Sequence, residues 1–399
     1  MYDFVIVGGG IIGASTALSI IKLNPKKKIL LLEKEKSFAF HQTGHNSGVI
    51  HAGVYYEPGS LKAKFCKRGL EETIKFCKQH NIPYSQCGKI LVATSKDELN
   101  RMQSLYERCQ KNNIDVSLLS KQELYKLEPD INGLGAILVK STAIVDYQAI
   151  TNKMANQYES LGGEFLLNTE VKNIDESLDS INIKTDNENI KARYLINCAG
   201  LMSDRIVNML GIKTDFRIIP FRGEYYKLKS NMNSIVKHLI YPIPDPELPF
   251  LGIHLTRMID GTITVGPNAV LGFKREGYGR YNFNLKDVAE MLSFKGFYKV
   301  ISTNIISGLK ELLNSFHKAS YLKQVQKYCP KIKLDDLEPY PAGIRAQAVL
   351  NDGTLVHDFL FTNSKRSIHV CNAPSPAATS AIPIGEYVAN KAIAGFDEL

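Results

Sequence analysis

The first 34 residues hold the feature that most constrains how this chain can fold. Residues 3–7 form an apolar run that predicts a buried strand, residues 8–13 spell G-x-G-x-x-G, and residues 14–23 continue as an apolar helix. A second apolar strand, residues 29–32, follows and ends on Glu33. This order of strand, glycine turn, helix, strand and acid is typical of a dinucleotide-binding βαβ unit.

Each glycine of the motif has its own physical task. Gly8 permits the tight turn, Gly10 lets the backbone approach a pyrophosphate, and Gly13 lets the helix pack closely on the strand. The helix N-terminus offers unpaired N–H groups to the anion. Glu33, 20 residues beyond Gly13, is placed to accept a hydrogen bond from a ribose hydroxyl. These residues predict that the chain binds a dinucleotide.

Length, composition and cysteine usage bound the class of protein. The chain has 399 residues, enough for two lobes, and its 44% hydrophobic and 22% charged residues are typical of a globular protein. Its seven cysteines include no C-x-x-C pair, which indicates reduced intracellular thiols, and we expect no metal site. We see no signal peptide and no apolar run of 18 residues, so we expect a cytoplasmic protein without a transmembrane span.

The net charge of +9 favours an anionic partner, which can be an acidic small molecule, a membrane surface or a nucleic acid. Much of the excess is scattered lysine, and the sequence has no RNA-binding signature and no tryptophan, so we expect no nucleic-acid partner. Residues 285–329 combine basic and apolar positions in a helical pattern. They predict either a peripheral contact with the inner face of the cytoplasmic membrane or a helical pair that covers a sheet.

The middle of the chain alternates between two kinds of structure. Residues 44–56, rich in glycine and histidine, predict a loop laid against a ligand. Residues 61–80 and 97–112 have helical spacing, and residues 89–93 form an apolar strand. Residues 215–270 are rich in strands and contain a hairpin that turns at Asp260 and Gly261, which predicts a sheet forming one wall of a substrate pocket.

The C-terminal segment repeats the strand, loop and helix order of the N-terminus. Residues 367–371 predict a buried strand, residues 372–380 a small-residue loop, and the residues up to 393 an apolar helix. Two such units at opposite ends of one chain imply an extended ligand, which favours flavin adenine dinucleotide (FAD) over a nicotinamide cofactor. A helix N-terminus at the second unit can also stabilise negative charge on the reduced flavin.

These patterns predict an α/β fold in which an FAD-binding, Rossmann-like doubly wound sheet is joined to an antiparallel-sheet substrate domain with covering helices. The predicted boundaries follow the same patterns along the chain. The FAD-binding domain is expected to comprise residues 1–80, 142–212 and 335–399, and the substrate domain residues 81–141 and 213–334.

Five segments carry a resemblance to a known family: residues 41–51, 220–225, 254–261, 266–269 and 372–380. Together they resemble the D-amino-acid-oxidase-like group of flavoproteins, and within it the L-2-hydroxyglutarate oxidases and dehydrogenases. The resemblance extends from the N-terminus to about residue 393. It implies oxidation of L-2-hydroxyglutarate, a dicarboxylate, to 2-oxoglutarate by hydride transfer to flavin N5, with electrons passing to a respiratory quinone or to oxygen.

The resemblance also implies a set of cofactor-binding residues around the glycine motif. Relatives in this group sometimes attach the flavin covalently through a histidine or cysteine; His45 could serve, but we expect non-covalent FAD. The predicted cofactor-binding residues are Gly8, Gly10, Ile11, Ile12, Gly13, Glu33, Lys34, Thr43, Gly44, His45, Asn46, Ser47, Gly48, Val171, Ala199, Gly200, Gly343, Ser375, Pro376, Ala377, Ala378 and Thr379.

Two histidines are candidates for the base that takes the hydroxyl proton. His254 belongs to the predicted pocket sheet and His51 to the predicted flavin loop, and an imidazole with a pKa near neutrality can accept a proton at working pH. Either histidine could instead only hydrogen-bond the flavin or a backbone carbonyl.

The substrate carboxylates call for at least one arginine. Arg345, in a Gly-x-Arg turn, is the first candidate because a guanidinium grips a carboxylate bidentately. Arg257, Thr256 and Tyr55 complete the predicted substrate site, and Arg222 is a weaker candidate because it can be a structural ion-pair partner.

Two other functions remain open at this point. An amine oxidase of the same fold would act on an amino acid, and a non-catalytic dinucleotide-binding regulator would show no flavin reduction by any 2-hydroxy acid. The basic composition favours the dianionic hydroxy acid over the amino acid.

Overall fold

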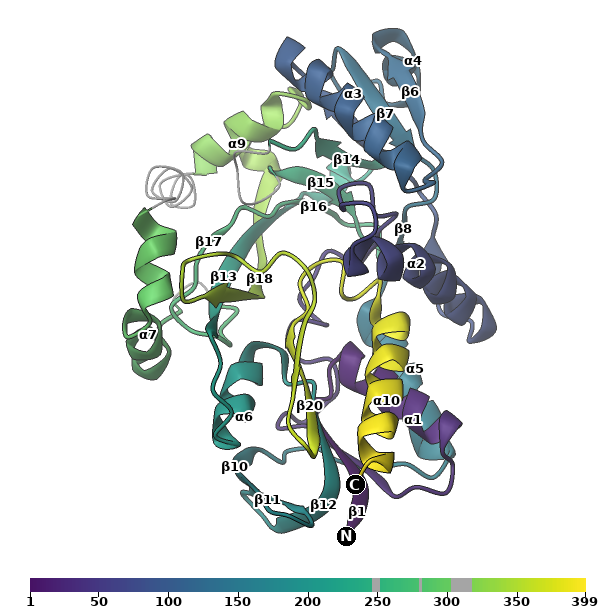
Figure 1. The fold of residues 1–399 in the computed structure, drawn as a ribbon. Coiled ribbons are helices and arrows are strands. Elements are labelled where there is room, and N and C mark those ends of the chain that lie inside the picture. Colours follow the sequence, from purple (N-terminus) through teal and green to yellow (C-terminus); the bar gives the residue numbers. More distant parts are fainter. Residues whose placement is uncertain (246–251, 280–281, 303–317) are drawn as a thin grey trace.

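The computed structural model of the protein describes residues 1–245, 252–279, 282–302 and 318–399. Two large sheets organise the molecule, an eight-stranded sheet near both termini and a nine-stranded sheet toward the other end (Figure 1). A three-stranded sheet of β3 (Val49–Ile50), β8 (Ala143–Val145) and β4 (Tyr84–Ser85) completes the described sheets. The predicted α/β fold class is confirmed.

The eight-stranded sheet has a parallel centre with the order β9-β2-β1-β12-β20. Its parallel strands are β1 (Tyr2–Val7), β2 (Ile29–Leu32), β9 (Glu164–Leu166), β12 (Asn189–Asn197) and β20 (Ser367–Asn372). Three antiparallel strands extend it, namely β10 (Val171–Glu176), β11 (Ile181–Thr185) and β19 (Leu360–Asn363). The parallel centre brings the carboxyl ends of strands from both termini of the chain to one edge.

Helices cover one face of this sheet. They are α1 (Ile11–Leu23), α5 (Tyr147–Ser160) and α10 (Ala381–Asp397), which lie side by side (Figure 1). Alternation along β1 explains the layering, because Phe4 and Ile6 pack in the core under these helices. Val5 and Val7 pack in the opposite core with β10 and β11. Burial on both faces is why β1 and β2 are continuous apolar runs.

The nine-stranded sheet has the order β17-β13-β16-β15-β14-β5-β7-β6, with β18 paired to β13. Its neighbours pair antiparallel except β14 and β5, which are parallel. The strands are β5 (Lys89–Ala93), β6 (Ser117–Ser120), β7 (Gly135–Val139), β13 (Phe216–Leu228), β14 (Leu239–Pro242), β15 (His254–Arg257), β16 (Ile263–Gly266), β17 (Val270–Leu271) and β18 (Leu337–Leu350).

The long strand β18 pairs with β13 along its length, from Leu350 opposite Phe216 to Leu337 opposite Leu228. Residues 337–350 therefore belong to the nine-stranded sheet, although the prediction placed residues 335–399 in the FAD-binding domain. The predicted domain division stays a prediction.

Several predicted elements are confirmed. The helices are α2 (Leu61–Gln79) and α3 (Lys96–Lys111), and the Ser95 hydroxyl caps α3 by accepting from the Glu98 N–H. The hairpin of β15 and β16 is also present. The other described helices are α4 (Lys121–Leu127), α6 (Ser203–Met209), α7 (Leu285–Leu292) and α9 (Lys318–Gln326), with short 3-10 turns at Gly200–Met202, Ser230–Met232 and Leu334–Asp336.

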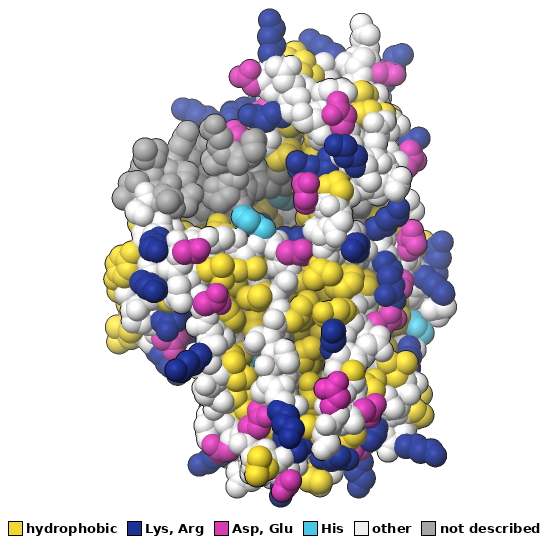
Figure 2. All heavy atoms as spheres, in the orientation of Figure 1, with side chains coloured by type: hydrophobic (Ala, Val, Ile, Leu, Met, Phe, Trp, Pro, Cys, Tyr) yellow, Lys and Arg dark blue, Asp and Glu magenta, His cyan; other side chains and the backbone are white. Residues whose placement is uncertain are grey.

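Two predicted segments fall partly outside the described residues. They are the helical region 285–329, which includes 303–317, and the strand-rich region 215–270, which includes 246–251. Within the described parts of the chain, no helix is long and apolar enough to cross a membrane. Figure 2 shows lysine and arginine side chains spread over one face of the molecule among acidic ones, as expected for scattered surface lysines.

Candidate functional site

A cavity of about 940 Å³ lies at the carboxyl ends of the parallel strands and continues to the nine-stranded sheet. Its lining includes Gly8 after β1, Glu33 after β2, Ala199 after β12 and Ala373 after β20. It also includes His254 of β15 and Arg345 of β18. Binding at the carboxyl edge of such a sheet is the rule for α/β proteins.

The glycine motif begins the cavity and leaves its backbone uncovered. Gly8 has φ +111, and a Cβ atom on it would lie 2.5 Å from the carbonyl oxygen of Cys198. A Cβ on Gly13 would lie 1.9 Å from the carbonyl oxygen of Gly8, so the helix can approach the strand only without a side chain there. Gly10 lines the cavity and is the N-cap of α1, and the Thr43 hydroxyl accepts from the Ile11 N–H at 3.1 Å. A helix N-terminus of this kind is a common site for an anion.

Glu33 stands next to this motif with only 7% of its surface exposed. Its carboxylate accepts hydrogen bonds from the N–H of Gly9 at 2.6 Å and of Glu35 at 2.9 Å. Burial raises the pKa of this carboxyl, and the two backbone N–H groups oppose the shift. The acid is thus fixed at the cavity wall, as a ribose-binding carboxylate needs to be.

Thr379 joins the loop after β2 to the loop after β20. Its hydroxyl oxygen accepts from the His51 N–H at 3.0 Å and donates to the Val49 carbonyl at 3.2 Å. The Tyr147 hydroxyl lies 3.1 Å from the same Thr379 oxygen and also donates to Val49. Residues some 330 positions apart therefore form one continuous cavity wall.

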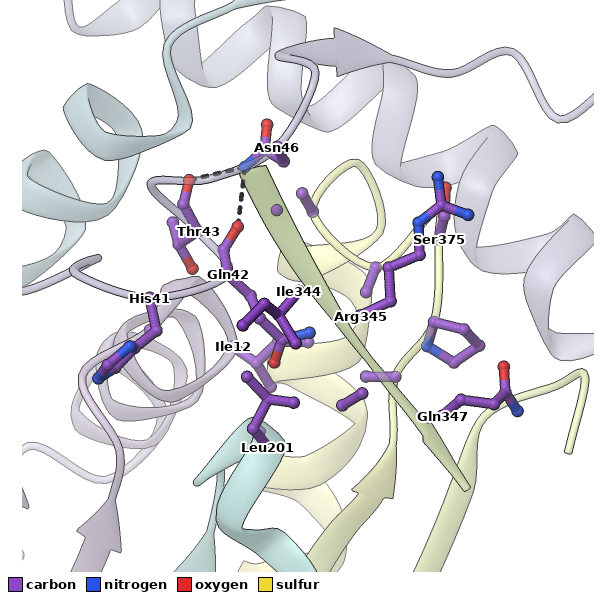
Figure 3. A pocket seen from close by; sticks show the side chains of 18 of the residues that line it. Ile12, His41, Gln42, Thr43, Asn46, Leu201, Ile344, Arg345, Gln347 and Ser375 are labelled. Carbon is purple, nitrogen blue, oxygen red and sulfur yellow. Dashed lines mark hydrogen bonds between the residues drawn. The ribbon is translucent and has the colours of Figure 1, made fainter. Parts of the chain in front are cut away.

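The loop of residues 41–48 is held by its own side chains (Figure 3). The Asn46 amide donates to the carbonyls of Thr43 at 2.6 Å and Gln42 at 3.3 Å, and its oxygen accepts from the Gly48 N–H. The His45 ring stacks on Tyr278, with ring centroids 3.6 Å apart. This backbone bracing makes the loop a fixed surface against which a flat ring can lie.

An ionic cluster stands at the rim beside this loop. Glu35, His41 and Glu276 place ligand atoms within 4.8 Å of one another, a geometry that could hold a metal and that the sequence did not predict. Lys34, however, pairs its ammonium with Glu276, and His41 bonds Glu35 at 2.9 Å. Lys34 thus compensates the charge of Glu276, and His41 satisfies Glu35 by a hydrogen bond.

At the other end of the cavity, His254 lies against the ring of Tyr241, with ring centroids 3.8 Å apart. Its Nδ1 is 3.0 Å from the Gly252 carbonyl oxygen, which can only accept, so Nδ1 carries the hydrogen. The neutral ring therefore keeps its lone pair on Nε2. Burial lowers the pKa of His254 to about 3. The positive charges of Lys89 and Arg345 also lower it, whereas the hydrogen bond to Gly252 raises it.

His51 lines the cavity close to these groups. Burial lowers its pKa well below the usual histidine value, and the positive charges of Lys89 and Arg345 act in the same direction. Arg345 remains accessible in the cavity and projects from β18 toward the loop that carries Ser375 (Figure 3). Its guanidinium hydrogen-bonds the phenol of Tyr225. Two neutral imidazoles and a guanidinium thus share one end of the cavity.

Comparison with known proteins agrees with this geometry. Residues 3–391 match the model of the FAD dependent oxidoreductase family, DAO. The chain belongs to this family. It is 56% identical over 392 residues to L-2-hydroxyglutarate dehydrogenase of Escherichia coli (strain K12), a match that covers 98% of this chain and 93% of the relative. It is 44% identical over 408 residues to the mitochondrial L-2-hydroxyglutarate dehydrogenase of Homo sapiens, covering 98% and 88%.

Solved structures share the fold. The L-alpha-glycerophosphate oxidase from Mycoplasma pneumoniae with FAD bound gives a TM-score of 0.79 at 22% identity, covering 99% of this chain and 94% of that one. The glycine oxidase from Geobacillus kaustophilus gives a TM-score of 0.74 at 16% identity, covering 98% and 95%. The family match makes the protein an FAD-dependent oxidoreductase, and its cavity, with a helix N-terminus and a buried acid at one end, fits this cofactor.

Most of the residues predicted from the sequence line this one cavity. They are Gly8, Gly10, Ile11, Ile12, Glu33, Lys34, Thr43, His45, Asn46, Ser47, His51, Tyr55, Val171, Ala199, Gly200, His254, Gly343, Arg345, Ser375, Pro376, Ala377, Ala378 and Thr379.

Three predicted glycines stand behind the lining and shape the backbone instead. Gly13 packs on Gly8, and Gly44 packs on Ala39, whose carbonyl oxygen would lie 2.5 Å from an added Cβ. Gly48 has φ +63 and faces the Val145 carbonyl. These three glycines can affect cofactor binding only indirectly, through the neighbouring residues that they position.

Two predicted substrate residues do not reach the cavity lining. Thr256 lies on the same strand face as His254 but two residues further along, which carries it about 6.6 Å away into the interior. Arg257 points to the other face and donates to the carbonyl of Lys237 at 2.9 Å. Arg222, the weaker candidate, is buried and bonds Glu224 and the Gly277 carbonyl.

Sequence reasoning missed Tyr241 and Lys89 at the reacting end. Lys89 is 1% exposed, and its ammonium lies 4.3 Å from the Tyr241 ring centre and 5.6 Å from that of Tyr55. Burial lowers its pKa to about 8. The one available signal was a lysine opening an otherwise apolar strand; nothing local identified Tyr241. Tyr225, also missed, belonged to the segment 220–225 on which the resemblance rested.

Proposed function

We propose that this protein oxidises L-2-hydroxyglutarate to 2-oxoglutarate. The observation that carries the proposal is the pairing of two neutral histidines with an accessible arginine at one end of a cavity whose other end is built for a dinucleotide. The names of the curated relatives, which match nearly the whole chain, support the substrate assignment.

Oxidation of the substrate removes a hydride from C2 and a proton from the hydroxyl group, and each needs its own acceptor. FAD, when bound, supplies a two-electron acceptor for the hydride from C2. His254 then takes the hydroxyl proton at Nε2, while the Gly252 carbonyl fixes its ring through Nδ1. His51 is the second candidate for this base, because it is neutral and lines the same end.

Arg345 binds a substrate carboxylate, assisted by the phenols that surround it. Its guanidinium is accessible in the cavity, and Tyr225 bonds to it and so limits its orientations. Tyr55 also lines the cavity, and its hydroxyl has no hydrogen-bond partner among the described residues. A carboxylate would satisfy both groups.

The alternative substrate, an amino acid, fits this end less well. Lys89 adds a buried positive charge behind Tyr55 and Tyr241, next to the accessible Arg345. An amino group would enter this field carrying a like charge, whereas a dianionic hydroxy acid is attracted by it. We therefore keep the amine oxidase only as an outcome of the test below.

FAD is held without a covalent bond in this proposal. His45, the residue that could attach it, is stacked on Tyr278, and its Nδ1 bonds the His41 carbonyl at 3.0 Å. Acid precipitation should release the yellow cofactor into the supernatant, and a coloured pellet would contradict this. In this proposal FAD lies on residues 1–80, 142–212 and 335–399, and the substrate domain comprises residues 81–141 and 213–334.

A peripheral membrane contact through α7 and the residues after it is a further part of the proposal. Met291, Phe294 and Phe297 pack in the core against β13 and β18, so this region covers the sheet. Its outer side still exposes apolar side chains beside basic ones: Phe283, Leu285, Leu292, Tyr298, Lys286 and Lys295. Such a surface suits an anionic bilayer, and cosedimentation with anionic vesicles tests it.

Anaerobic reduction of the purified yellow protein tests the function. We expect L-2-hydroxyglutarate to bleach the flavin absorbance, and glutamate or glycine to leave it unchanged. Mixing the reduced protein with either oxygen or a quinone analogue then identifies the electron acceptor. Bleaching by amino acids alone would make the protein an amine oxidase, and no bleaching by any of these compounds would favour a non-catalytic role.

The rate of flavin reduction at saturating substrate should be independent of pH between about pH 5 and pH 8. A base must be unprotonated to accept a proton, and burial holds the pKa of His254 at about 3, so the loss of rate begins only below about pH 4. An exposed histidine would lose rate tenfold per unit below about pH 6.5. Stopped-flow measurement of the reduction rate across this pH range checks the prediction. A rate that falls to half near pH 6.5 would contradict a buried base.

A further inference from the structure

The charges that line the cavity are unevenly distributed. Seven lysines and arginines face four aspartates and glutamates in the whole lining. At the glycine-motif end the charges balance, since three carboxylates stand with three cations: Glu33, Glu170, Glu276, Lys34, Arg205 and Lys286. The whole excess therefore lies in the rest of the lining, away from the glycine motif.

Beyond Arg345, three cations of this excess line one arm of the cavity. Arg101 and Arg108 come from α3, and Lys62 from the first turn of α2. We call these three residues the cationic arm. Arg101 and Arg108 are seven positions apart, which places them on one side of their helix, and Leu105 lines the cavity between them. Helix geometry thus points both arginines at the same space.

The arm is fixed in place by the loop that also carries Tyr55. Arg108 donates to the Tyr55 carbonyl at 3.3 Å, and Asn112 of the same helix end donates to the Tyr56 carbonyl at 2.8 Å. The Lys62 ammonium lies 5.7 Å from the Tyr56 ring centre. The aromatic residues between arm and histidines therefore connect the two parts of the cavity.

The carboxylates near the arm do not cancel its charge. Asp245 is the one acidic residue that the cavity lining contributes here among the described residues, and it lies 3.5 Å from Arg101. Asp358 lies near Lys62, and its two carboxylate oxygens accept hydrogen bonds from the N–H groups of Leu61 and Lys62. Burial lowers the pKa of Lys62 to about 8, against the effect of Asp358. The arm is left with a net positive charge.

One buried polar atom of the cationic arm and one of the neighbouring Tyr55 have no partner among the described residues. The Nε of Arg101 and the hydroxyl of Tyr55 are shielded from solvent, and neither has a hydrogen-bond partner among the described residues. Polar groups in such positions are nearly always satisfied by protein, water or a ligand. Both residues line the cavity, where a bound anion can supply such a partner.

We propose that Lys62, Arg101 and Arg108 form a capture site that draws a dicarboxylate into the cavity and passes it to Arg345. The inference rests on the proposed function and adds how its substrate class is selected. The arm acts on association and on discrimination between dianions and monoanions. It does not act on hydride transfer, because it stands apart from the histidines.

The test is stopped-flow reduction of the FAD-loaded full chain by L-2-hydroxyglutarate and by L-2-hydroxybutyrate, its monocarboxylate counterpart, at low and high salt. Arg101→Gln and Arg108→Gln remove charge, and Arg101→Lys and Arg108→Lys preserve it. Lys26→Gln, at an exposed site remote from the cavity lining, is the matched control for loss of one positive charge.

We expect each charge-removing variant to lower the apparent second-order rate constant for L-2-hydroxyglutarate about tenfold at low salt, with the limiting reduction rate changed less than about twofold. High salt should shrink the difference, and L-2-hydroxybutyrate should be affected less. The lysine variants and Lys26→Gln should behave like the unchanged protein.

An equal loss in the glutamine and lysine variants would assign the arginines a structural role and overturn the proposal. A fall in the limiting rate without a change in salt dependence would also overturn it. If the unchanged protein is not reduced by L-2-hydroxyglutarate, the proposed function fails. In that case the capture site can still be tested with glutarate, a dicarboxylate that is not oxidised. Its association rate is measured from the change in the flavin spectrum when it binds.

Discussion

Replacing His254 with alanine should lower the rate constant of flavin reduction about a hundredfold or more, the scale of lost general-base catalysis. The variant loses the Nε2 lone pair that the Gly252 bond leaves free in the neutral ring. Stopped-flow absorbance under anaerobic conditions measures this directly, after the FAD content has been matched by the flavin spectrum. The affinity for the substrate should change much less than the rate.

Two comparisons separate chemistry from packing at this position. Alanine leaves a gap beside the Tyr241 ring, so added imidazole should restore part of the rate if the lost function is proton transfer. His51→Ala tests the competing candidate on the same cavity wall. An unchanged rate in His254→Ala, together with a large loss in His51→Ala, would transfer the role to His51.

Arg345→Ala should chiefly weaken substrate binding. A charge-assisted hydrogen bond is worth about 1.5–3 kcal/mol, so we expect the apparent dissociation constant to rise roughly tenfold to a hundredfold. The limiting rate should fall less, since the hydride and the proton leave other parts of the substrate. The dissociation constant comes from the substrate dependence of the observed reduction rate.

The chain offers a matched control for this change. Arg257 was a candidate for the same role from the sequence, but its guanidinium bonds the Lys237 carbonyl outside the cavity lining. Arg257→Ala should therefore leave substrate affinity unchanged, and Arg345→Lys should recover only part of it because lysine cannot bind bidentately. Normal affinity in Arg345→Ala would exclude Arg345 from the carboxylate site.

Local sequence signals predicted the dinucleotide end of the cavity well. Gly8, Gly10 and Glu33 lie within one βαβ unit, where spacing alone fixes their relative positions. The two small-residue loops that meet at Thr379 were also predictable, because each follows a buried parallel strand and such strands share an edge.

The reacting end depended on long-range pairing that no local pattern specifies. The parallel pairing of β14 with β5 brings Tyr241 and Lys89 together, although 152 positions separate them. Thr256 was predicted from its strand face, yet the face alone does not say how far along the strand a cavity extends. The sheet to which β18 belongs could not be predicted either, because alternating apolar residues fit either sheet and only its partner β13 decides between them.

The bridge through Thr379 also bears on how the protein is made. The cavity wall at Thr379 needs β20 and α10, which are translated more than 330 residues after the glycine motif. Because a chain folds as it emerges, we expect the early βαβ unit to form before β20 inserts beside β12. A chain that stops before β20 should therefore lack one wall of the cavity and hold FAD poorly, even when flavin is in excess.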